Sequence, residues 1–288
     1  MLHTVDEKRR LSKVIEDRLS KSAEVRPFPA AVTRLTAACQ DPNADGKVFE
    51  SIIECDPALS GKILRLANSP LFCPSGTVKS IPHAVSLLGL RKLKSVAMSV
   101  AGAAMFSSGD GATAQRKKLW DHSIGCAVVA RCLADLVPGV DKDEAFLGGV
   151  FHDVGKLLFY DTIPAEYSEV TASFAGGQLV EEERFLFGVT HEEVGLVSAT
   201  SWELPAEIST AIRWHHDPDS ADDFARYAAV THAADGLARV WCIGSVEHHE
   251  STAVESAADR FELTDDQLEA IKEHSRDAFD ETMAASAD

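Results

Sequence analysis

The chain is poor in positive charge. Its 288 residues include 28 Lys and Arg against 45 Asp and Glu, which gives a formal net charge of −17. A surface this acidic repels phosphate backbones and so argues against sequence-independent binding to nucleic acid. Long apolar runs are also missing. No run is long enough to span a bilayer, and the N-terminal residues lack the apolar core of a signal peptide. We therefore expect a cytoplasmic protein that binds neither nucleic acid nor membrane.

The chain also lacks any C-x-x-C pair. Its six cysteines are scattered along the sequence and mostly lie in apolar segments. This distribution is typical of reduced, buried thiols, which agrees with a cytoplasmic location.

Patterns typical of β-strands are absent as well. We find no convincing alternation of apolar and polar residues and few runs of β-branched residues, whereas apolar residues recur at helical spacing. The fold class expected is therefore all-α. The predicted helices cover residues 5–22, 30–39, 47–54, 57–67, 81–106 with an interruption at Gly89, 116–137, 143–160, 163–175, 178–187, 190–202, 205–217, 222–241 and 264–284.

The helices divide into segments of different composition. Residues 107–114 are rich in Gly, Ser and Ala without an apolar period, so we interpret them as a loop between two helical lobes. The expected organisation is an N-terminal helix in 1–24, a helical lobe in 25–108, a second lobe in 109–245 and an acidic helical tail in 246–288. This tail has few large apolar residues, so it either packs on the body as one weak amphipathic helix or is partly disordered.

One apolar run, from Phe146 to Phe159, contains the polar residues His152, Asp153 and Lys156. Burying such groups is costly unless they are paired with one another or bound to a metal ion. Adjacent residues lie roughly 100° apart around a helix. His152 and Asp153 can therefore face a common centre only near a helix end or from a wide buried face.

Other helices of the second half supply further metal-binding side chains. His122 lies on the apolar face of its helix, although a lone histidine there is more often a core residue. His191 follows Thr190 in a capping-box sequence, and a helix start favours the neutral imidazole that binds metals. His215 and His216 end a helix before Asp217-Pro218, and His232 and Asp235 share a helix face. The metal ligands we predict are His122, His152, Asp153, His191, His215, His216 and Asp235.

This set of ligands indicates which metals would fit. Mixed imidazole and carboxylate ligands suit iron or manganese, with zinc, nickel and cobalt as alternatives, and do not suit calcium. Seven ligands exceed what one tetrahedral ion needs, so we expect two divalent ions bridged by Asp153. The resulting positive charge, increased by Lys156, would attract an anion such as a phosphate ester.

These residues resemble a known superfamily. His122, His152-Asp153 and Asp235 match the H…HD…D pattern of the HD-domain metal-dependent phosphohydrolases. The segment from His152 to Lys156, with the later histidines, is similar to the HD-GYP phosphodiesterases of cyclic di-GMP. The Gly-Tyr-Pro loop of that family is missing after the histidine pair, which argues against hydrolysis of cyclic di-GMP. Lys118 stands where some members carry a carboxylate for a third metal, so we expect no third ion.

The first half of the chain narrows the resemblance to the HDOD family. The segments that resemble this family are Phe28–Val32, Ile52–Ser69, Ser80–Arg91, Ala145–Asp153, Glu183–Gly188 and His191–Gly195, and the similarity extends over about residues 25–242. The resemblance implies an all-helical bacterial signalling module. Many members have lost metal ligands and are thought to work through protein contacts, whereas this chain keeps the whole set.

Two functions therefore stay open. The first is a regulatory module that binds protein partners of a signalling pathway, with a core that binds metal or ligand without efficient turnover. The second is a metal-dependent phosphohydrolase of a nucleotide or other phosphoester, in which Asp153 and Lys156 are the catalytic residues. A purely structural protein with a vestigial site is hard to reconcile with so many retained ligands.

Overall fold

The computed structural model describes residues 30–41, 44–73, 77–107, 113–244 and 252–286. Within these ranges the chain is helical and contains no β-strand, which confirms the predicted fold class. The predicted helix 5–22 lies outside the described residues. The division into two lobes stays a prediction. No helix in the described ranges is long and apolar enough to cross a membrane.

The first helices follow the local sequence signals. They are α2 (Ala30–Gln40), α3 (Gly46–Glu54), α4 (Pro57–Ala67) and α5 (Ile81–Ser107). The Asp56 side chain accepts hydrogen bonds of 3.0 Å from the backbone N–H groups of Ala58 and Leu59, with Pro57 in the first turn. Gly89 interrupts α5 with a φ of 78°, a left-handed conformation that favours glycine. Both features were predicted.

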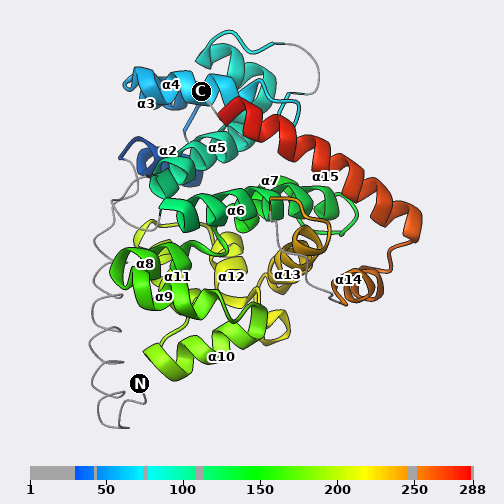
Figure 1. Ribbon diagram of the computed structural model, residues 1–288. Coiled ribbons are helices and arrows are strands. Elements are labelled where there is room, and N and C mark those ends of the chain that lie inside the picture. The colour runs from blue at the N-terminus through cyan, green and yellow to red at the C-terminus, as the bar shows by residue number, and fades with distance from the viewer. Residues whose placement is uncertain (1–29, 42–43, 74–76, 108–112, 245–251, 287–288) are drawn as a thin grey trace.

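The predicted helix 143–160 is wrong in one respect. It is two helices, α7 (Lys142–Phe151), which packs against the long α6 (Thr113–Ala134), and α8 (Val154–Thr162), which lies below α6 in Figure 1. The break falls at His152-Asp153, where Asp153 has a ψ of 12° and leaves the helical conformation. Because the two residues now cap different helices, their side chains are free to face a shared centre.

Glycines on both sides of the break permit close packing. A Cβ atom at Gly149 would lie 2.5 Å from the Cα of Ala127 on α6, and one at Gly155 would lie 1.9 Å from the carbonyl oxygen of His191. No side chain larger than hydrogen fits at either position. The glycines therefore fix α7 against α6 and α8 against the start of α11.

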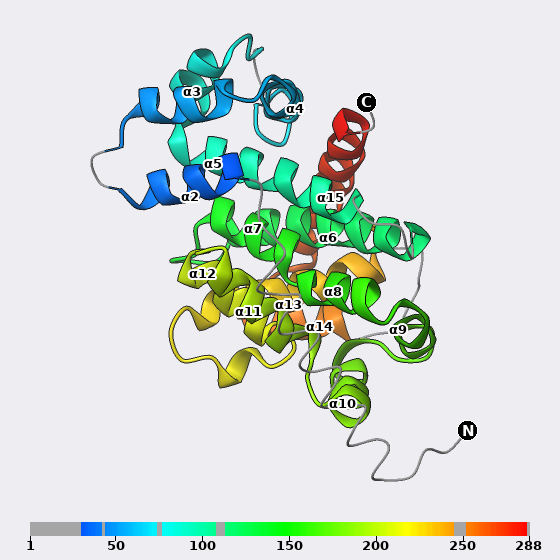
Figure 2. The ribbon, with the colours of Figure 1, turned by 90° about the vertical axis from the view of Figure 1, so that its left-hand side faces the viewer.

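The other helices of the second half surround this pair. They are α9 (Pro164–Thr171), α10 (Gly176–Phe187), α11 (His191–Ser201), α12 (Ala206–Trp214), the short 3-10 helix η1 (Pro218–Ser220) and α13 (Ala225–Val240). Helix α7 packs between α6, α12 and α13. Figure 2 shows α2–α4 at one end of the molecule and α9 and α10 at the other. The residues at the α7–α8 break thus lie within the buried middle of the second half.

The C-terminal segment packs on the body rather than standing apart. It contains α14 (Ala253–Phe261), which was not predicted, and α15 (Asp265–Ser286). Helix α15 lies across α6 and also contacts α4 (Figure 1). Its Leu268 and Ile271 are buried. Few apolar residues are therefore enough to hold the acidic tail against the rest of the chain.

Candidate metal centre

Asp153 stands between two sets of histidines. Its Oδ1 lies 3.4 Å from Nε2 of His191 and 3.6 Å from Nε2 of His215. Its Oδ2 lies 3.3 Å from Nε2 of His152 and 3.9 Å from Nε2 of His122. The side chain is 1% exposed. One carboxylate thus faces two groups of nitrogen donors, with one oxygen toward each.

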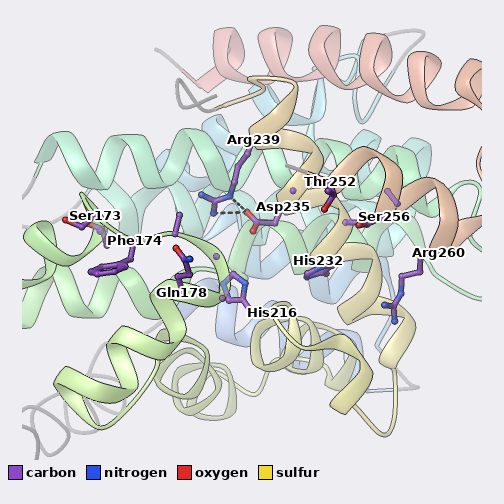
Figure 3. A pocket seen from close by; sticks show the side chains of 18 of the residues that line it. Ser173, Phe174, Gln178, His216, His232, Asp235, Arg239, Thr252, Ser256 and Arg260 are labelled. Atoms are coloured by element: carbon purple, nitrogen blue, oxygen red, sulfur yellow. Dashed lines mark hydrogen bonds and ion pairs between the residues drawn. The ribbon is translucent and has the colours of Figure 1, made fainter. Parts of the chain in front are cut away.

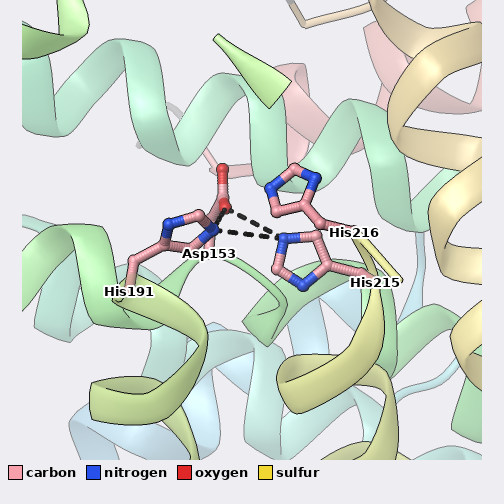
Figure 4. A group of neighbouring side chains, drawn as sticks. All are labelled: Asp153, His191, His215 and His216. Atoms are coloured by element: carbon pink, nitrogen blue, oxygen red, sulfur yellow. Dashed lines mark hydrogen bonds and ion pairs between the residues drawn. The ribbon is translucent and has the colours of Figure 1, made fainter. Parts of the chain in front are cut away.

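We call the first set the Asp153 group. It comprises Asp153, His191, His215 and His216, whose nearest ligand atoms lie within 4.8 Å of one another (Figure 4). His191 is the first residue of α11, and the Thr190 capping box predicted from the sequence is present. His215 caps the C-terminal end of α12, and His216 follows it. Two helix ends therefore direct three imidazoles at Asp153.

We call the second set the His122 group. It comprises His122 from α6, His152 from the end of α7 and Asp235 from α13, again within 4.8 Å of one another. Nε2 of His122 lies 2.8 Å from Oδ1 of Asp235, and Nε2 of His152 lies 3.7 Å from the same oxygen. The structure thus brings all seven predicted ligands into two adjoining groups, and their role as ligands stays a prediction. His232, outside that set, binds the carbonyl oxygen of His215 through Nδ1 at 2.7 Å.

Backbone contacts fix the orientation of two rings. Nδ1 of His152 lies 2.8 Å from the carbonyl oxygen of Gly149, and Nδ1 of His215 lies 3.0 Å from that of Ile212. A carbonyl oxygen can only accept, so both Nδ1 atoms donate a hydrogen. The Nε2 atoms of both rings then face Asp153, in position to share an ion with its carboxylate.

Several polar atoms of the site are buried without a hydrogen-bond partner in the described chain. They are Nδ1 of His122, Nε2 of His152, Oδ1 of Asp153 and Nε2 of His216. Such orphaned atoms are rare in folded proteins because each one loses its hydration without compensation. In addition, Nε2 of His191 lies 3.3 Å from Nε2 of His215. A divalent cation that accepts imidazole and carboxylate ligands would satisfy most of these atoms, so the residues fit such an ion.

Burial sets the charge of most of these histidines. It lowers the pKa of His122 and of His215 to about 4, and it lowers the pKa of His216 well below its usual value. All three are therefore neutral at pH 7, the form that binds metals. Burial also opposes the charged form of His152, but the neighbouring Asp153 outweighs it and holds the pKa of His152 well above the usual value.

The carboxylates stay charged for a related reason. Burial alone would raise the pKa of Asp153, but His152 and Lys156 outweigh burial and hold that pKa well below its usual value. The pKa of Asp235 is likewise held down, against burial, chiefly by Arg239 and then by His122. Both acids are therefore available as negatively charged ligands.

Glu183 is a buried contact that the sequence analysis missed. Its Oε2 accepts from the backbone N–H of His191 at 2.8 Å and from Nδ1 of the same residue at 2.7 Å. Its Oε1 accepts from the hydroxyl of Tyr167 at 2.5 Å. A carboxylate bonded to the far nitrogen of a metal-binding histidine fixes its tautomer and ring orientation. The sequence carried a signal for the burial of Glu183, because Leu179, Glu183 and Phe187 recur every four residues and so share one face of α10, which is buried.

Two cations of the protein also contact the site. Nζ of Lys156 lies 2.8 Å from Oδ2 of Asp153. Arg239, which the sequence analysis missed, contacts Oδ1 of Asp235 through Nε at 3.0 Å and Nη2 at 2.9 Å (Figure 3). Its Nη2 also lies 3.3 Å from Nε2 of His122. Arg239 follows Asp235 by one helical turn, so the pair was readable as an i, i+4 ion pair.

Two cavities lead to the centre. The larger, of about 900 Å³, is lined by His216, Asp235, Arg239 and Arg260 (Figure 3). The other, of about 660 Å³, reaches His122, Asp153, Lys156 and Lys118. Arg239 lines both. Cavities of this size hold small organic ligands, and the cations in their walls favour an anionic one.

Solved structures share this fold. An HDOD domain protein of unknown function from Geobacter sulfurreducens is 26% identical, with a TM-score of 0.72 over 93% of this chain and 89% of that one. A candidate phosphohydrolase from Shewanella amazonensis SB2B is 23% identical, with a TM-score of 0.74 over 93% of this chain and 97% of that one. The second likeness, at this identity, concerns the fold alone.

Among curated proteins, an uncharacterized protein of Treponema pallidum is 25% identical over 219 residues, which are 75% of this chain and 42% of the relative. Ribonuclease Y of Thermus thermophilus is 31% identical over 116 residues, 40% of this chain and 15% of the relative. The chain spans less than half the length of these two relatives. The family model of the HDOD domain matches residues 25–218, about two thirds of the sequence. On this match, the chain belongs to the HDOD domain family.

Proposed function

We propose that the protein is a bacterial, cytoplasmic signalling module whose helical core binds divalent metal and which acts through protein partners. The observation that carries the metal-binding part is the position of Asp153, with one oxygen toward each group of histidines. The signalling part rests on membership of the HDOD family and on the contacts that the protein's own cations make with the site.

The Asp153 group would hold the first ion. It offers one carboxylate oxygen and three imidazoles, a donor set that suits iron or manganese and also zinc, nickel or cobalt. Glu183 holds His191, and the Ile212 carbonyl holds His215, with Nε2 free for an ion. Because these contacts already fix the two imidazole rings, less side-chain entropy is lost when an ion binds.

The His122 group would hold a second ion, with Asp153, whose Oδ2 faces this group, as the residue common to both groups. His122 is neutral because burial lowers its pKa to about 4, and Asp235 is charged. Divalent ions bound here would supply Lewis acidity toward a phosphate oxygen. Lys156, whose Nζ lies beside Oδ2, would add a positive charge for such a ligand.

Two contacts favour regulation over turnover. Oδ2 of Asp153 is bonded to Lys156, and Oδ1 of Asp235 is bonded to Arg239. A carboxylate engaged by a protein cation is a weaker metal ligand and a weaker base, because part of its charge is already compensated. A metal centre whose two carboxylates are bonded to protein cations suits ligand-dependent regulation better than repeated hydrolysis.

The second candidate is hydrolysis of a phosphoester, with a nucleotide among the substrates considered. The observation in its favour is the pair of cavities, whose walls carry Lys156, Arg239 and Arg260 next to the candidate ligands. Asp153 and Lys156 would be the catalytic residues, since Lys156 is placed to stabilise negative charge on a phosphate. Ribonuclease Y, which this chain resembles in part, bears the name of a phosphodiester-cleaving enzyme.

One experiment separates the two functions. The protein is expressed with added iron or manganese, its metal content is measured by elemental analysis, and it is then assayed with bis(p-nitrophenyl) phosphate and a set of nucleotides. Bound metal without hydrolysis supports the signalling module. Hydrolysis that is lost in Asp153→Ala supports the enzyme and contradicts the first proposal, whereas absence of bound metal contradicts both.

A further inference from the structure

We infer that Arg239 is an internal cation that takes the place of a metal ion in the His122 group. The resting protein then holds one divalent ion, in the Asp153 group, and the second position opens only when a phosphate-bearing ligand draws the guanidinium away. This inference rests on the proposed function, because it assumes that the Asp153 group binds metal.

The guanidinium of Arg239 lies against two residues of the His122 group. Nε and Nη2 of Arg239 are 3.0 and 2.9 Å from Oδ1 of Asp235, and Nη2 is 3.3 Å from Nε2 of His122. An ion held by the His122 group would use one nitrogen or oxygen of each residue, and Nε2 of His122 and Oδ1 of Asp235 are the atoms that face the guanidinium. An ion needs them at about 2.0–2.2 Å. The guanidinium and the ion would therefore compete for the same lone pairs.

Charge makes the competition exclusive. An arginine stays protonated at any physiological pH, so Arg239 cannot give way by losing a proton. A divalent ion placed against the guanidinium would meet strong repulsion, because both are cations within a few ångströms in a buried site. The second ion can bind only after the Arg239 side chain has moved.

The Asp153 group has no such competitor at its carboxylate oxygen. Oδ1 of Asp153, which faces His191 and His215, has no hydrogen-bond partner in the described chain. Lys156 contacts the opposite oxygen, Oδ2, on the side of the His122 group. Both protein cations therefore lie on one side of Asp153, and the other side is open to an ion.

The surroundings of Arg239 offer a means of release. Its side chain is 18% exposed and lines both cavities, with Arg260 in the wall of the larger one. A phosphate group in that cavity would present two oxygens to the fork of the guanidinium, a stronger match than the single Oδ1 of Asp235 that it now contacts. Binding of a phosphate ester and loading of the second ion would then favour each other, as linkage requires.

The test counts bound Mn²⁺ by equilibrium dialysis and examines its EPR spectrum, which differs between an isolated ion and a coupled pair. We expect one Mn²⁺ per wild-type chain. We expect two, with a coupled spectrum, in Arg239→Met and in Arg239→Gln; the second variant serves if the first does not fold. Arg226→Met removes a cation that lines neither cavity and contacts no candidate ligand, and it should keep one.

The effect of inorganic phosphate on the Mn²⁺ count provides a second measurement. Inorganic phosphate should strengthen binding of a second Mn²⁺ in the wild type and should have little effect on the count in Arg239→Met. Two ions in the wild type without phosphate, one ion in both Arg239 variants, or no effect of phosphate would each contradict the inference and leave the proposed metal binding intact. No ion in any variant would contradict the proposed function itself.

Discussion

Nδ1 of His191 donates a hydrogen bond of 2.7 Å to Oε2 of Glu183, and the backbone N–H of His191 donates to the same oxygen at 2.8 Å. The two contacts fix both the start of α11 and the plane of the imidazole. They place Nε2 of His191 toward Asp153 before any ion arrives.

Replacing Glu183 by Gln should therefore weaken metal binding. The amide keeps the shape of the side chain but loses the charge that aligns His191, and such losses typically reduce metal affinity about 10- to 100-fold. Titration with Mn²⁺ or Zn²⁺ measures the change. Glu181→Gln, on the exposed side of α10, is the matched control. Equal affinities in the two variants would show that Glu183 does not act through His191.

Asp153→Ala should abolish metal binding, because it removes the carboxylate that faces both groups. Elemental analysis of the purified variant checks this expectation, with Asp135→Ala on the surface as control. The change also leaves the buried Lys156 without its partner, so the free energy of unfolding should fall by about 3 kcal/mol. A variant that retains its full metal content would mean that Asp153 does not bridge the groups.

Asp235→Ala and His232→Ala compare two neighbours on α13. Asp235 belongs to the His122 group, whereas His232 bonds to the backbone of His215 through Nδ1. With phosphate present, we expect Asp235→Ala to lower metal content more than His232→Ala. Metal analysis of both variants side by side is sufficient, and the reverse order would assign the ligand role to His232.

The metal-free protein should lose stability as the pH falls from about 6.5 to about 4. Burial lowers the pKa of His122 and His215 to about 4 in the folded state, so in this window the unfolded chain takes up protons that the folded chain does not. Each histidine would remove about 3 kcal/mol across the whole window. The raised pKa of His152 does not change this trend, because its contribution to stability is already complete below its unfolded pKa and is constant in this window.

Urea unfolding at a series of pH values, after treatment with a chelator, measures this change. Since the pKa values of His122, His215 and His216 are all lowered in the folded protein, the midpoint should decline steadily toward pH 4. A midpoint that is constant or rises between pH 6.5 and 4 would contradict the assignment of neutral His122 and His215.

Gly155→Ala tests the packing at the break between α7 and α8. The new Cβ would lie 1.9 Å from the carbonyl oxygen of His191, so α8 and α11 must separate. Forced repacking of this kind typically costs about 1–3 kcal/mol or more, and metal affinity should fall with it. Gly61→Ala meets nothing within 4 Å and provides the control. Thermal melts and metal titrations on both variants give the answer.

The sequence predicted those features of the site that depend on local patterns. The capping box at Thr190 and the Asp56-Pro57 helix start were readable because each acts within four residues. The seven candidate ligands were identifiable because polar residues in apolar helices are uncommon, and the structure brings all of them together.

Features that depend on distant contacts escaped prediction. The break at His152-Asp153 carries no Pro, and its glycines are explained only by the helices they touch, α6 and α11. Glu183 and Arg239 have ordinary local surroundings for a charged residue, and their role follows from the spatial neighbours His191 and Asp235. Helix α14 was missed although Val254, Ala257, Ala258 and Phe261 recur in it at helical spacing.

The two glycines beside the His152-Asp153 pair limit which helices can move when a ligand binds. A helix that touches its neighbour's backbone without an intervening side chain cannot slide by one residue, because the next side chain would collide. Gly149 and Gly155 therefore make the floor of the site stiff. Movement on ligand binding is therefore left to the wall formed by α13, which carries the flexible side chain of Arg239 and packs against α14.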